Sequence, residues 1–417
     1  MRVYKFGGAS IKDAAGVRNV AEIMQKEEAS GCLLVISAMG KMTNAFEGIV
    51  NAYCSQKEKL ADAIDFVSTY HTNIINDLFD ENHEVRSKVR GLLEKLEEFL
   101  VQNKSTDYDY LYDQIVSFGE MISTTIVSDY FSEVYIQNTL NDVRELVFTD
   151  SSHRDAKVNW ELTRKEINNR IDRSSLSIVQ GFLGGDSNQT TTTLGREGSD
   201  YTAGIFAYCL DAESVTIWKD VQGILNADPR VFKDTQLLEQ ISYEETIEMA
   251  FYGASVVHPK TIQPLQNKEI PLYVRSFKDV SLKGTKVSRG IAIQPLLPCF
   301  IVKKNQILIS ISALDFSFMV EDNISHIFKL LHHHLLKVNL IQNSAISFSV
   351  CVDNKFNQFE TFYQELKSSY KVEYVKNVNL YTVRHFTDES LNQIYDKGSP
   401  LLTQINKETA QIIIKDS

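Results

Sequence analysis

The chain has 417 residues and a formal net charge of −11, with 43 lysines and arginines against 54 aspartates and glutamates. This length allows two or three domains with full cores, and the acidic balance argues against nucleic acid or an anionic membrane surface as the main partner. We find no apolar segment of membrane-spanning length and no leader sequence behind Met1. Five scattered cysteines without a CxxC pair favour reduced thiols in a cytoplasmic protein that has no metal cage.

A short strand, a glycine turn and a helix start open the chain. Residues 3–6 are typical of a strand, the pair Gly7 and Gly8 follows with Ser10 close behind, and an apolar helical pattern comes next. Backbone N–H groups at such a helix start bind anions, and Lys5 at the end of the strand adds a point charge. The stretch indicates a phosphate cradle, while a plain tight turn is the alternative for the two glycines alone.

Two further strands are predicted to end in small and polar residues. Cys32–Ile36 is a continuous apolar run, typical of a strand buried on both faces, and Ser37 and Thr43 follow it. A second run, 177–182, leads towards the glycine-rich stretch 195–200. Parallel sheets bind ligands at the carboxyl ends of their strands, so these ends are candidate parts of a site.

The stretch 195–200 carries a cation and an anion where a strand gives way to a helix. Arg196 suits a carboxylate ligand, and Asp200 suits the orientation of a phosphate or a metal ion. A solvated loop in which Ser199 or Asp200 caps the helix is the alternative.

Helical segments with few candidate residues fill much of the region between these strands. The stretch 55–103 has an apolar stripe opposite charged residues, which predicts helices that cover the sheet. Glu120 follows among apolar neighbours, where a glutamate is usually exposed on the far face. Gly119 beside it hints at the close approach of another segment.

Strands and helices alternate up to about residue 280, which predicts an α/β fold with a mostly parallel sheet. One of these strands, 214–221, contains Lys219 and Asp220 near its end, and Gly223 and Arg230 follow it.

The pattern changes from residue 281. The polar, basic segment 281–298 contains glycines and prolines, and we interpret it as a linker. The order of strands and helices over 307–375 is βαββαβ, which predicts a ferredoxin-like domain, and 380–414 contains part of a second copy. The run 332–334 consists of three histidines, but consecutive side chains point around a helix and do not converge on one ion.

Together these motifs resemble those of the aspartokinases, members of the amino acid kinase family, over the whole chain. The resemblance implies a three-layer αβα amino acid kinase fold over 1–280 and a ferredoxin-like ACT-type regulatory region over 299–417, with one full unit and one shortened unit. The segments that carry it are 5–10, 37–44, 117–120, 195–200, 220–230 and 258–261.

The resemblance also implies the reaction, in which ATP phosphorylates the side-chain carboxylate of L-aspartate. The product, 4-phospho-L-aspartate, leads towards lysine, threonine and methionine. ATP and Mg²⁺, bound mainly through the nucleotide, are the implied cofactors, and a homodimer or larger homo-oligomer through the ACT region is the implied assembly. By similarity, Lys5 and Asp200 are catalytic, and Thr43, Glu120 and Arg196 hold aspartate. The implied nucleotide-binding residues are Lys5, Gly7, Gly8, Ser10, Ser37, Asp220, Gly223 and Arg230.

Some positions depart from the family pattern. Four of them, at Ala9, Glu197, Lys219 and Ser255, affect the expected contacts with ATP more than those with aspartate. In lysine-sensing relatives, carboxylates occupy the positions of Asn339 and Ala345. Their loss removes natural partners of a lysine ammonium group, so we predict lysine feedback that is weak, altered or absent.

Two alternatives remain open at this point. The first is a related kinase that acts on glutamate, acetylglutamate, carbamate or UMP, against which the segments 117–120 and 195–200 argue. The second is a non-catalytic amino-acid-binding regulator on a kinase fold, against which the retained Lys5, Arg196 and Asp200 argue.

Overall fold

The computed structural model describes residues 1–28, 30–254, 257–315 and 317–415. The chain divides into two compact units. The first comprises Met1–Ile224, Leu237–Ile247 and Val257–Ile293, and the second comprises Leu225–Gln236, Glu248–Val256 and Gln294–Ser417. Within the described residues, no helix combines the length and the apolar character needed to cross a membrane.

A nine-stranded sheet forms the centre of the first unit, in the order β11-β8-β10-β9-β7-β1-β2-β4-β3. The pairs from β9 through β7, β1, β2 and β4 to β3 are parallel, and β10 runs antiparallel to β9. The mostly parallel α/β sheet predicted from the sequence is therefore confirmed. Its strands are β1 (Arg2–Phe6), β2 (Cys32–Ile36), β3 (Asn138–Asn141), β4 (Leu176–Gln180), β7 (Ser214–Lys219), β8 (Gln240–Ser242), β9 (Leu272–Ser276), β10 (Thr285–Ser288) and β11 (Ile293–Gln294).

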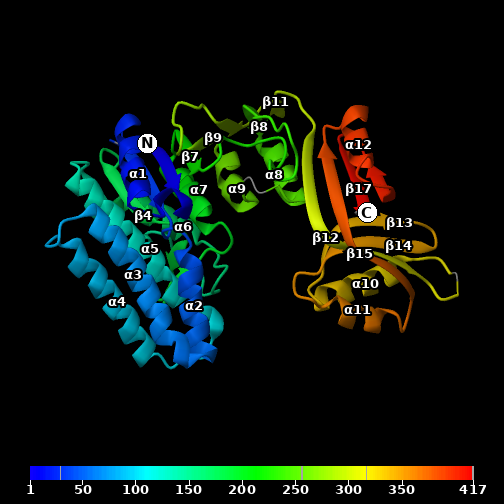
Figure 1. Ribbon diagram of the computed structural model, residues 1–417, viewed down its shortest axis with the longest axis horizontal. Coiled ribbons are helices and arrows are strands. Elements are labelled where there is room, and N and C mark those ends of the chain that lie inside the picture. The colour runs from blue at the N-terminus through cyan, green and yellow to red at the C-terminus, as the bar shows by residue number, and fades with distance from the viewer. Residues whose placement is uncertain (29, 255–256, 316, 416–417) are drawn as a thin grey trace. The chain divides into compact units, whose positions relative to one another are not determined.

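Helices cover both faces of this sheet and make the three layers of the fold (Figure 1). Helices α1 to α5 gather on one face, and α6, α7 and α9 on the other. Because both faces are covered, β2 and β4 are buried at every position, which explains their continuous apolar sequences. The helices are α1 (Ala14–Lys26), α2 (Met42–Ser55), α3 (Leu60–Leu78), α4 (Val85–Gln102), α5 (Tyr108–Glu133), α6 (Trp160–Arg170), α7 (Gly198–Leu210), α8 (Tyr243–Tyr252) and α9 (Pro259–Asn267).

Glycines let the turns at the ends of neighbouring strands pack against each other. The amide of Gly40 donates to the carbonyl of Gly8 at 3.0 Å. A Cβ atom at Gly8 would lie 2.5 Å from the carbonyl oxygen of Gly40 and 2.7 Å from that of Ala38. Likewise, a Cβ at Gly181, after β4, would lie 2.5 Å from Cβ of Ser199 in α7. The ends of β1, β2 and β4 therefore meet the start of α7 at one edge of the sheet.

The segment 281–298, interpreted from the sequence as a linker, is part of the sheet instead. It contains β10 and β11, and Thr285 in β10 is fully buried. The Thr285 hydroxyl donates to the carbonyl of Leu238 and accepts from the amide of Ile224. Hydrogen bonds of this kind allow polar side chains to be buried in a strand. The polar composition of the segment therefore did not reveal the strand.

A six-stranded antiparallel sheet forms the second unit, in the order β13-β14-β12-β15-β17-β16. The first part has the predicted βαββαβ order, and the shorter second part adds one helix and two strands. The elements are β12 (Cys299–Ser312), α10 (Glu321–His333), β13 (Lys337–Asn343), β14 (Ser347–Asp353), α11 (Phe359–Leu366), β15 (Lys371–Arg384), α12 (Asp388–Tyr395), β16 (Pro400–Ile405) and β17 (Thr409–Lys415).

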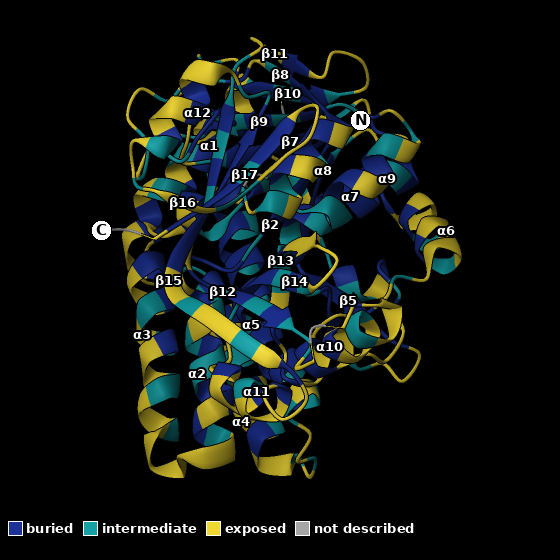
Figure 2. Cartoon of the chain, turned by 90° about the vertical axis from the view of Figure 1, so that its right-hand side faces the viewer, coloured by how far each residue is buried: buried dark blue, intermediate teal, exposed yellow. Residues whose placement is uncertain are grey.

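Two features of this sheet differ from the sequence prediction. Strand β15 is one continuous element where two were expected, and Figure 2 shows it exposed along its first half and buried along its second. The sequence analysis also missed β16, an edge strand that starts at a proline and is mostly exposed. Edge strands tolerate proline and polar residues, which hides them from a search for apolar alternation.

The packing of Gly8 leads to a first prediction. Gly8→Ala should lower the free energy of unfolding by about 1–3 kcal/mol, because the added methyl group meets two backbone carbonyls that cannot move independently. Gly91→Ala, within α4, is the matched control, since its added methyl group meets no atom within 4 Å. It should raise the free energy of unfolding by about 0.5–1 kcal/mol. Urea unfolding measures both, and equal effects of the two substitutions would contradict the close packing.

Candidate active site

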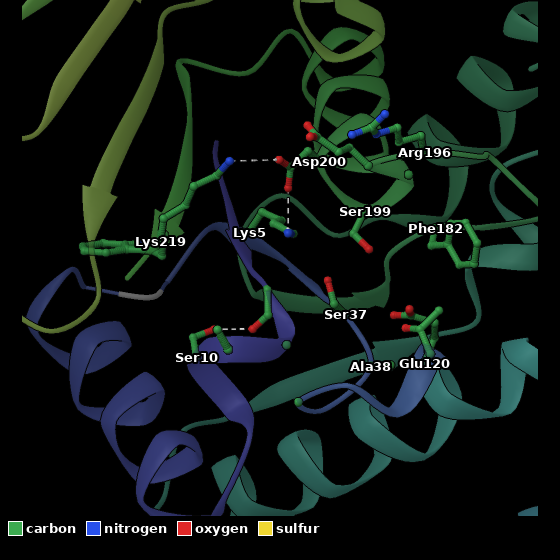
Figure 3. A pocket seen from close by; sticks show the side chains of 18 of the residues that line it. Lys5, Ser10, Ser37, Ala38, Glu120, Phe182, Arg196, Ser199, Asp200 and Lys219 are labelled. Atoms are coloured by element: carbon green, nitrogen blue, oxygen red, sulfur yellow. Dashed lines mark hydrogen bonds and ion pairs between the residues drawn. The ribbon is translucent and has the colours of Figure 1, made fainter. Parts of the chain in front are cut away.

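A cavity of about 640 Å³ opens in the first unit, where the strand ends described above meet α5 and α7 (Figure 3). Most of the site residues predicted from the sequence line it. They are Lys5, Gly7, Gly8, Ser10, Ser37, Thr43, Glu120, Arg196, Asp200 and Asp220.

A buried ion pair lies at the centre of the cavity. Nζ of Lys5, at the end of β1, is 2.6 Å from a carboxylate oxygen of Asp200, in the first turn of α7. Nζ of Lys219, at the end of β7, is 3.8 Å from the other oxygen. Burial by itself would raise the pKa of Asp200, but the charges of Lys5 and Lys219 outweigh it and hold the pKa below its ordinary value. Asp200 therefore stays ionised and orients both lysines.

The glycine turn after β1 leaves room for a ligand beside the ammonium group of Lys5. A Cβ atom at Gly7 would lie 3.2 Å from Nζ of Lys5, so any side chain there would crowd the charge. The Ser10 hydroxyl donates to the carbonyl of Gly7 at 2.5 Å, and this bond shapes the turn. The turn and the lysine together can hold a phosphate group.

Glu120 enters the cavity from α5 and is only 2% exposed, which corrects the view that a glutamate in this setting is exposed. Gly119 allows α5 to pack closely against α2 at this point, because a Cβ there would lie 3.0 Å from the ring of Phe46. Burial raises the pKa of the Glu120 carboxyl to about 8, against the opposing effects of Lys5 and of the Ala38 backbone. Its Oε2 atom has no hydrogen-bond partner in the described structure. A buried carboxyl group with one unpartnered oxygen is suited to a cationic ligand.

Arg196 lies in the loop before α7 and is exposed, and Figure 3 shows it on a different side of the cavity from Glu120. We find no ion pair or hydrogen bond of its guanidinium group within residues 1–28, 30–254, 257–315 and 317–415. A free guanidinium group and a buried carboxyl group at one cavity can bind the two charged groups of an amino acid.

Gly223 and Arg230 do not line this cavity. A Cβ atom at Gly223 would lie 2.7 Å from Oγ1 of Thr285, so the glycine allows close packing near β10. Arg230 belongs to the second unit, is 84% exposed and pairs with Asp228 at 2.7 Å. The nucleotide contacts expected of both stay predictions.

Several lining residues were not predicted from the sequence. They are Tyr112, Arg154, Phe182, Ser199, Trp218 and Phe277. Phe182 ends the predicted run 177–182 and Ser199 lies within the predicted segment 195–200, which is a signal that the search could have used. Arg154 comes from the loop before α6 and belongs to none of the motifs. Of the departures noted above, Ala9, Glu197 and Lys219 line the cavity, and Ser255 lies outside the described residues.

Comparison with known proteins gives the family of the chain. The model of the amino acid kinase family matches residues 1–276. The chain belongs to the amino acid kinase family. Lysine-sensitive aspartokinase 3 of Escherichia coli K12 is 31% identical over 357 residues, which cover 84% of this kinase and 78% of the relative. The bifunctional aspartokinase/homoserine dehydrogenase of Buchnera aphidicola is 29% identical over 298 residues, and the match spans only 36% of its length.

Two solved structures have the same fold over the whole chain. E. coli aspartokinase III in complex with lysine and aspartate has a TM-score of 0.84 and 26% identity, with 100% of this kinase and 96% of that chain covered. The same enzyme in complex with aspartate and ADP has a TM-score of 0.81, with equal identity and coverage. The amino acid kinase fold, together with a C-terminal antiparallel region, is therefore established for this chain.

The raised pKa of Glu120 leads to a second prediction. The pKa in the folded state, about 8, lies above the ordinary value of 4.5, so the folded protein holds this proton more tightly than the unfolded chain. The stability that the group contributes is fully present at low pH and is lost as the pH rises through 8. Glu120→Gln has no proton to lose, so its stability relative to the wild type should increase from about pH 5 to about pH 8.5.

Urea unfolding without ligands, repeated over this pH range, measures the effect. Glu98→Gln in α4 changes the same residue type at an exposed position and is the control. A stability difference between Glu120→Gln and the wild type that does not vary with pH would rule out the shifted titration.

Proposed function

We propose that this kinase transfers the γ-phosphoryl group of ATP to the side-chain carboxylate of L-aspartate, giving 4-phospho-L-aspartate and ADP. The observation that carries the proposal is the arrangement of one cavity, with the lysine pair around Asp200, the free guanidinium of Arg196 and the buried carboxyl of Glu120. The aspartate and ADP held in the aspartokinase III structures support the same assignment.

The phosphate side is proposed to consist of the turn after β1 with the two lysines. Gly7 and Gly8 present backbone N–H groups, and Ser10 and Ser37 complete the turns beside them. Lys5 neutralises charge on the phosphoryl group during transfer. Asp220 is proposed to frame the nucleotide, together with Gly223 and Arg230.

Mg²⁺ is proposed to arrive with the nucleotide. Within the described residues there is no group of three or more histidine, cysteine or acidic side chains that could hold a metal ion by itself. Phosphate oxygens are the usual ligands of this ion, and when bound it neutralises their charge. The open ammonium group of Lys5 beside Gly7 fits a phosphate that carries such an ion.

The aspartate side needs position more than chemical activation. A carboxylate is already ionised at neutral pH, so the attacking group needs no general base. Arg196 is proposed to hold the α-carboxylate and Glu120 the α-ammonium group, with Thr43 beside them. The side-chain carboxylate then faces the phosphoryl group at Lys5, and the gain in rate comes from alignment and neutralised charge.

Two other functions remain as alternatives. Another acid substrate would leave the phosphate side unchanged and alter the contacts of Arg196 and Glu120. A non-catalytic regulator would have no need for the buried pair of Lys5 and Asp200, which is costly to bury unless both partners are kept.

Loss of Lys5 tests the enzyme assignment. Lys5→Ala should reduce aspartate-dependent ADP release by a factor of about 100 or more, because it removes the cation that faces the phosphoryl group. Lys26→Ala, at the exposed end of α1, is the control and should keep full activity. Coupled ADP detection with aspartate, glutamate, acetylglutamate, carbamate and UMP separates the alternatives. Turnover of glutamate but not aspartate, or no turnover at all, would refute the proposal.

The second unit is proposed to be an ACT-type regulatory and dimerisation region. The product of the reaction, 4-phospho-L-aspartate, is proposed to lead towards lysine, threonine and methionine. Its edge strand β13 and the surrounding segments carry exposed apolar side chains, at Phe318, Phe328, Ile341 and Ile346. An open edge with apolar neighbours suits pairing with a second copy. A cytoplasmic location is also proposed, and the reduced cysteines of the described chain agree with it.

Lysine feedback is proposed to be weak, altered or absent. The side chain of Asn339 is already engaged within the second unit, where its Oδ1 accepts from Nζ of Lys303 at 2.8 Å and its Nδ2 donates to Gln306 at 2.6 Å. A lysine of the chain itself therefore uses the acceptor that a free lysine would need.

An activity titration checks this expectation. Lysine and threonine, each added up to several millimolar, should leave the aspartate-dependent rate within a factor of about two. An amino acid whose contacts with the second unit contribute little binding free energy does not occupy the site at these concentrations. Strong inhibition by lysine below about 1 mM, a concentration that reflects specific binding, would show that the site survives in another form.

A further inference from the structure

Two arginines line the cavity, and the family motifs account for only one of them, Arg196. The other, Arg154, comes from a neighbouring loop. The amide of Ala156 donates to the carbonyl of Thr193 at 3.0 Å. A Cβ atom at Gly195 would lie 3.1 Å from the carbonyl oxygen of Arg154. The two arginines therefore reach the cavity from backbone segments that are in direct contact.

A single buried carboxylate, that of Asp113, holds these two segments together. It accepts hydrogen bonds from the amide of Arg154 at 3.1 Å, from the amide of Thr193 at 3.0 Å and from the Thr193 hydroxyl at 2.6 Å. His153 adds a contact at 2.9 Å. Asp113 is fully buried on α5, the helix that carries Glu120 two turns further on. One helix thus sets the positions of both loops relative to Glu120.

The conformation of Arg154 is unusual for its residue type. Its φ angle is +65°, in the left-handed region that disfavours side chains with a Cβ atom. Backbone strain of this kind is retained chiefly at functional sites. Glycine would relieve this strain, so replacement by glycine removes the side chain without disturbing the turn.

The side chain of Arg154 is held at the rim of the cavity. Its guanidinium carbon lies 4.4 Å from the centre of the Tyr112 ring, and Tyr112 itself lines the cavity. Asp109, at 3.3 Å, and Glu47, at 3.8 Å, pair with it from partly exposed positions. A guanidinium group has five N–H donors, so these contacts leave donors for a further anion.

We propose that Arg154 and Arg196 form a two-arginine clamp on the α-carboxylate of the amino acid substrate. This inference rests on the proposed function and adds a substrate-binding residue to it. The side-chain carboxylate has to face the phosphoryl group at Lys5, and Glu120 takes the ammonium group. The α-carboxylate is then the anion left for the remaining cations, and it has enough lone pairs to accept from two guanidinium groups.

Kinetics of Arg154→Gly test the clamp. Glycine removes the side chain and also relieves the left-handed conformation, so folding should not suffer. The KM for aspartate should rise about tenfold, the loss typical of one charge-assisted hydrogen bond, with the KM for ATP unchanged. Arg154→Lys should fall between, because it keeps the charge and loses the planar donors. Arg164→Ala, at an exposed position outside the cavity, is the control.

A substrate analogue shows which group Arg154 contacts. L-Aspartic acid α-amide keeps the ammonium group and the reacting carboxylate but has no charge at the α position. If Arg154 binds the α-carboxylate, Arg154→Gly should cost less than about twofold in kcat/KM with the amide, and about tenfold with aspartate. A merely structural role would lower both values by the same factor.

The outcomes separate the two proposals. If the wild type releases ADP with aspartate and Arg154→Gly leaves its KM unchanged, the clamp is wrong and the proposed function stands. Equal losses with aspartate and its amide also overturn the clamp. A wild type that releases no ADP with aspartate overturns the proposed function, and the clamp with it.

Discussion

The buried ion pair of Lys5 and Asp200 is the interaction on which the rest of the site depends. Lys5 lies near the end of β1, which is between β2 and β7 within the sheet, and Asp200 lies in the first turn of α7. Neither charge could be buried there alone, because an unpaired buried charge costs several kcal/mol. The pair therefore ties the start of α7 to the end of β1, and the loop that carries Arg196 is fixed by the same attachment.

Four cations line the cavity, Lys5, Arg154, Arg196 and Lys219, together with four carboxyl groups, Glu120, Glu197, Asp200 and Asp220, and burial keeps Glu120 protonated, so the net charge is only slightly positive. Such a cavity does not attract two anions through net charge. It has to act through position, with each charged group of the ligands opposite one partner. Burial keeps the proton on Glu120 until a cation arrives, which limits repulsion between its carboxyl group and incoming phosphates. The arrangement thus favours substrates that bring an ammonium group together with their carboxylates.

The sequence revealed those parts of the molecule whose physics is local. Apolar runs predicted β2 and β4, and the glycine turns predicted the edge of the sheet at which the cavity opens. It did not reveal features made by distant segments. The hydroxyl of Thr285 is satisfied by residues some 50 positions away, so β10 resembled a linker. Arg154 enters the cavity because Asp113 binds its amide across 41 residues, and no local pattern records that contact. Burial of Glu120 likewise depends on Phe46 and Ala38, from a different strand end and helix.

The second unit contains a lysine that is held by internal polar contacts next to its two core clusters. Two core clusters lie under different helices, one with α10 and α11 and the other with α12, and both include side chains of the long strands β12 and β15 or their neighbours. Lys303 lies in β12, next to a shift in the pairing register between β12 and β15. Burial, and secondarily Lys337, lowers its pKa to about 8, while its ammonium group bonds Asn339 and the carbonyl of Phe251. A carboxylate at position 339 would pair with the ammonium group of Lys303 inside the unit. It would then be less available to a free amino acid. The amide of Asn339 is therefore part of an internal network of the second unit, at the exposed edge strand β13.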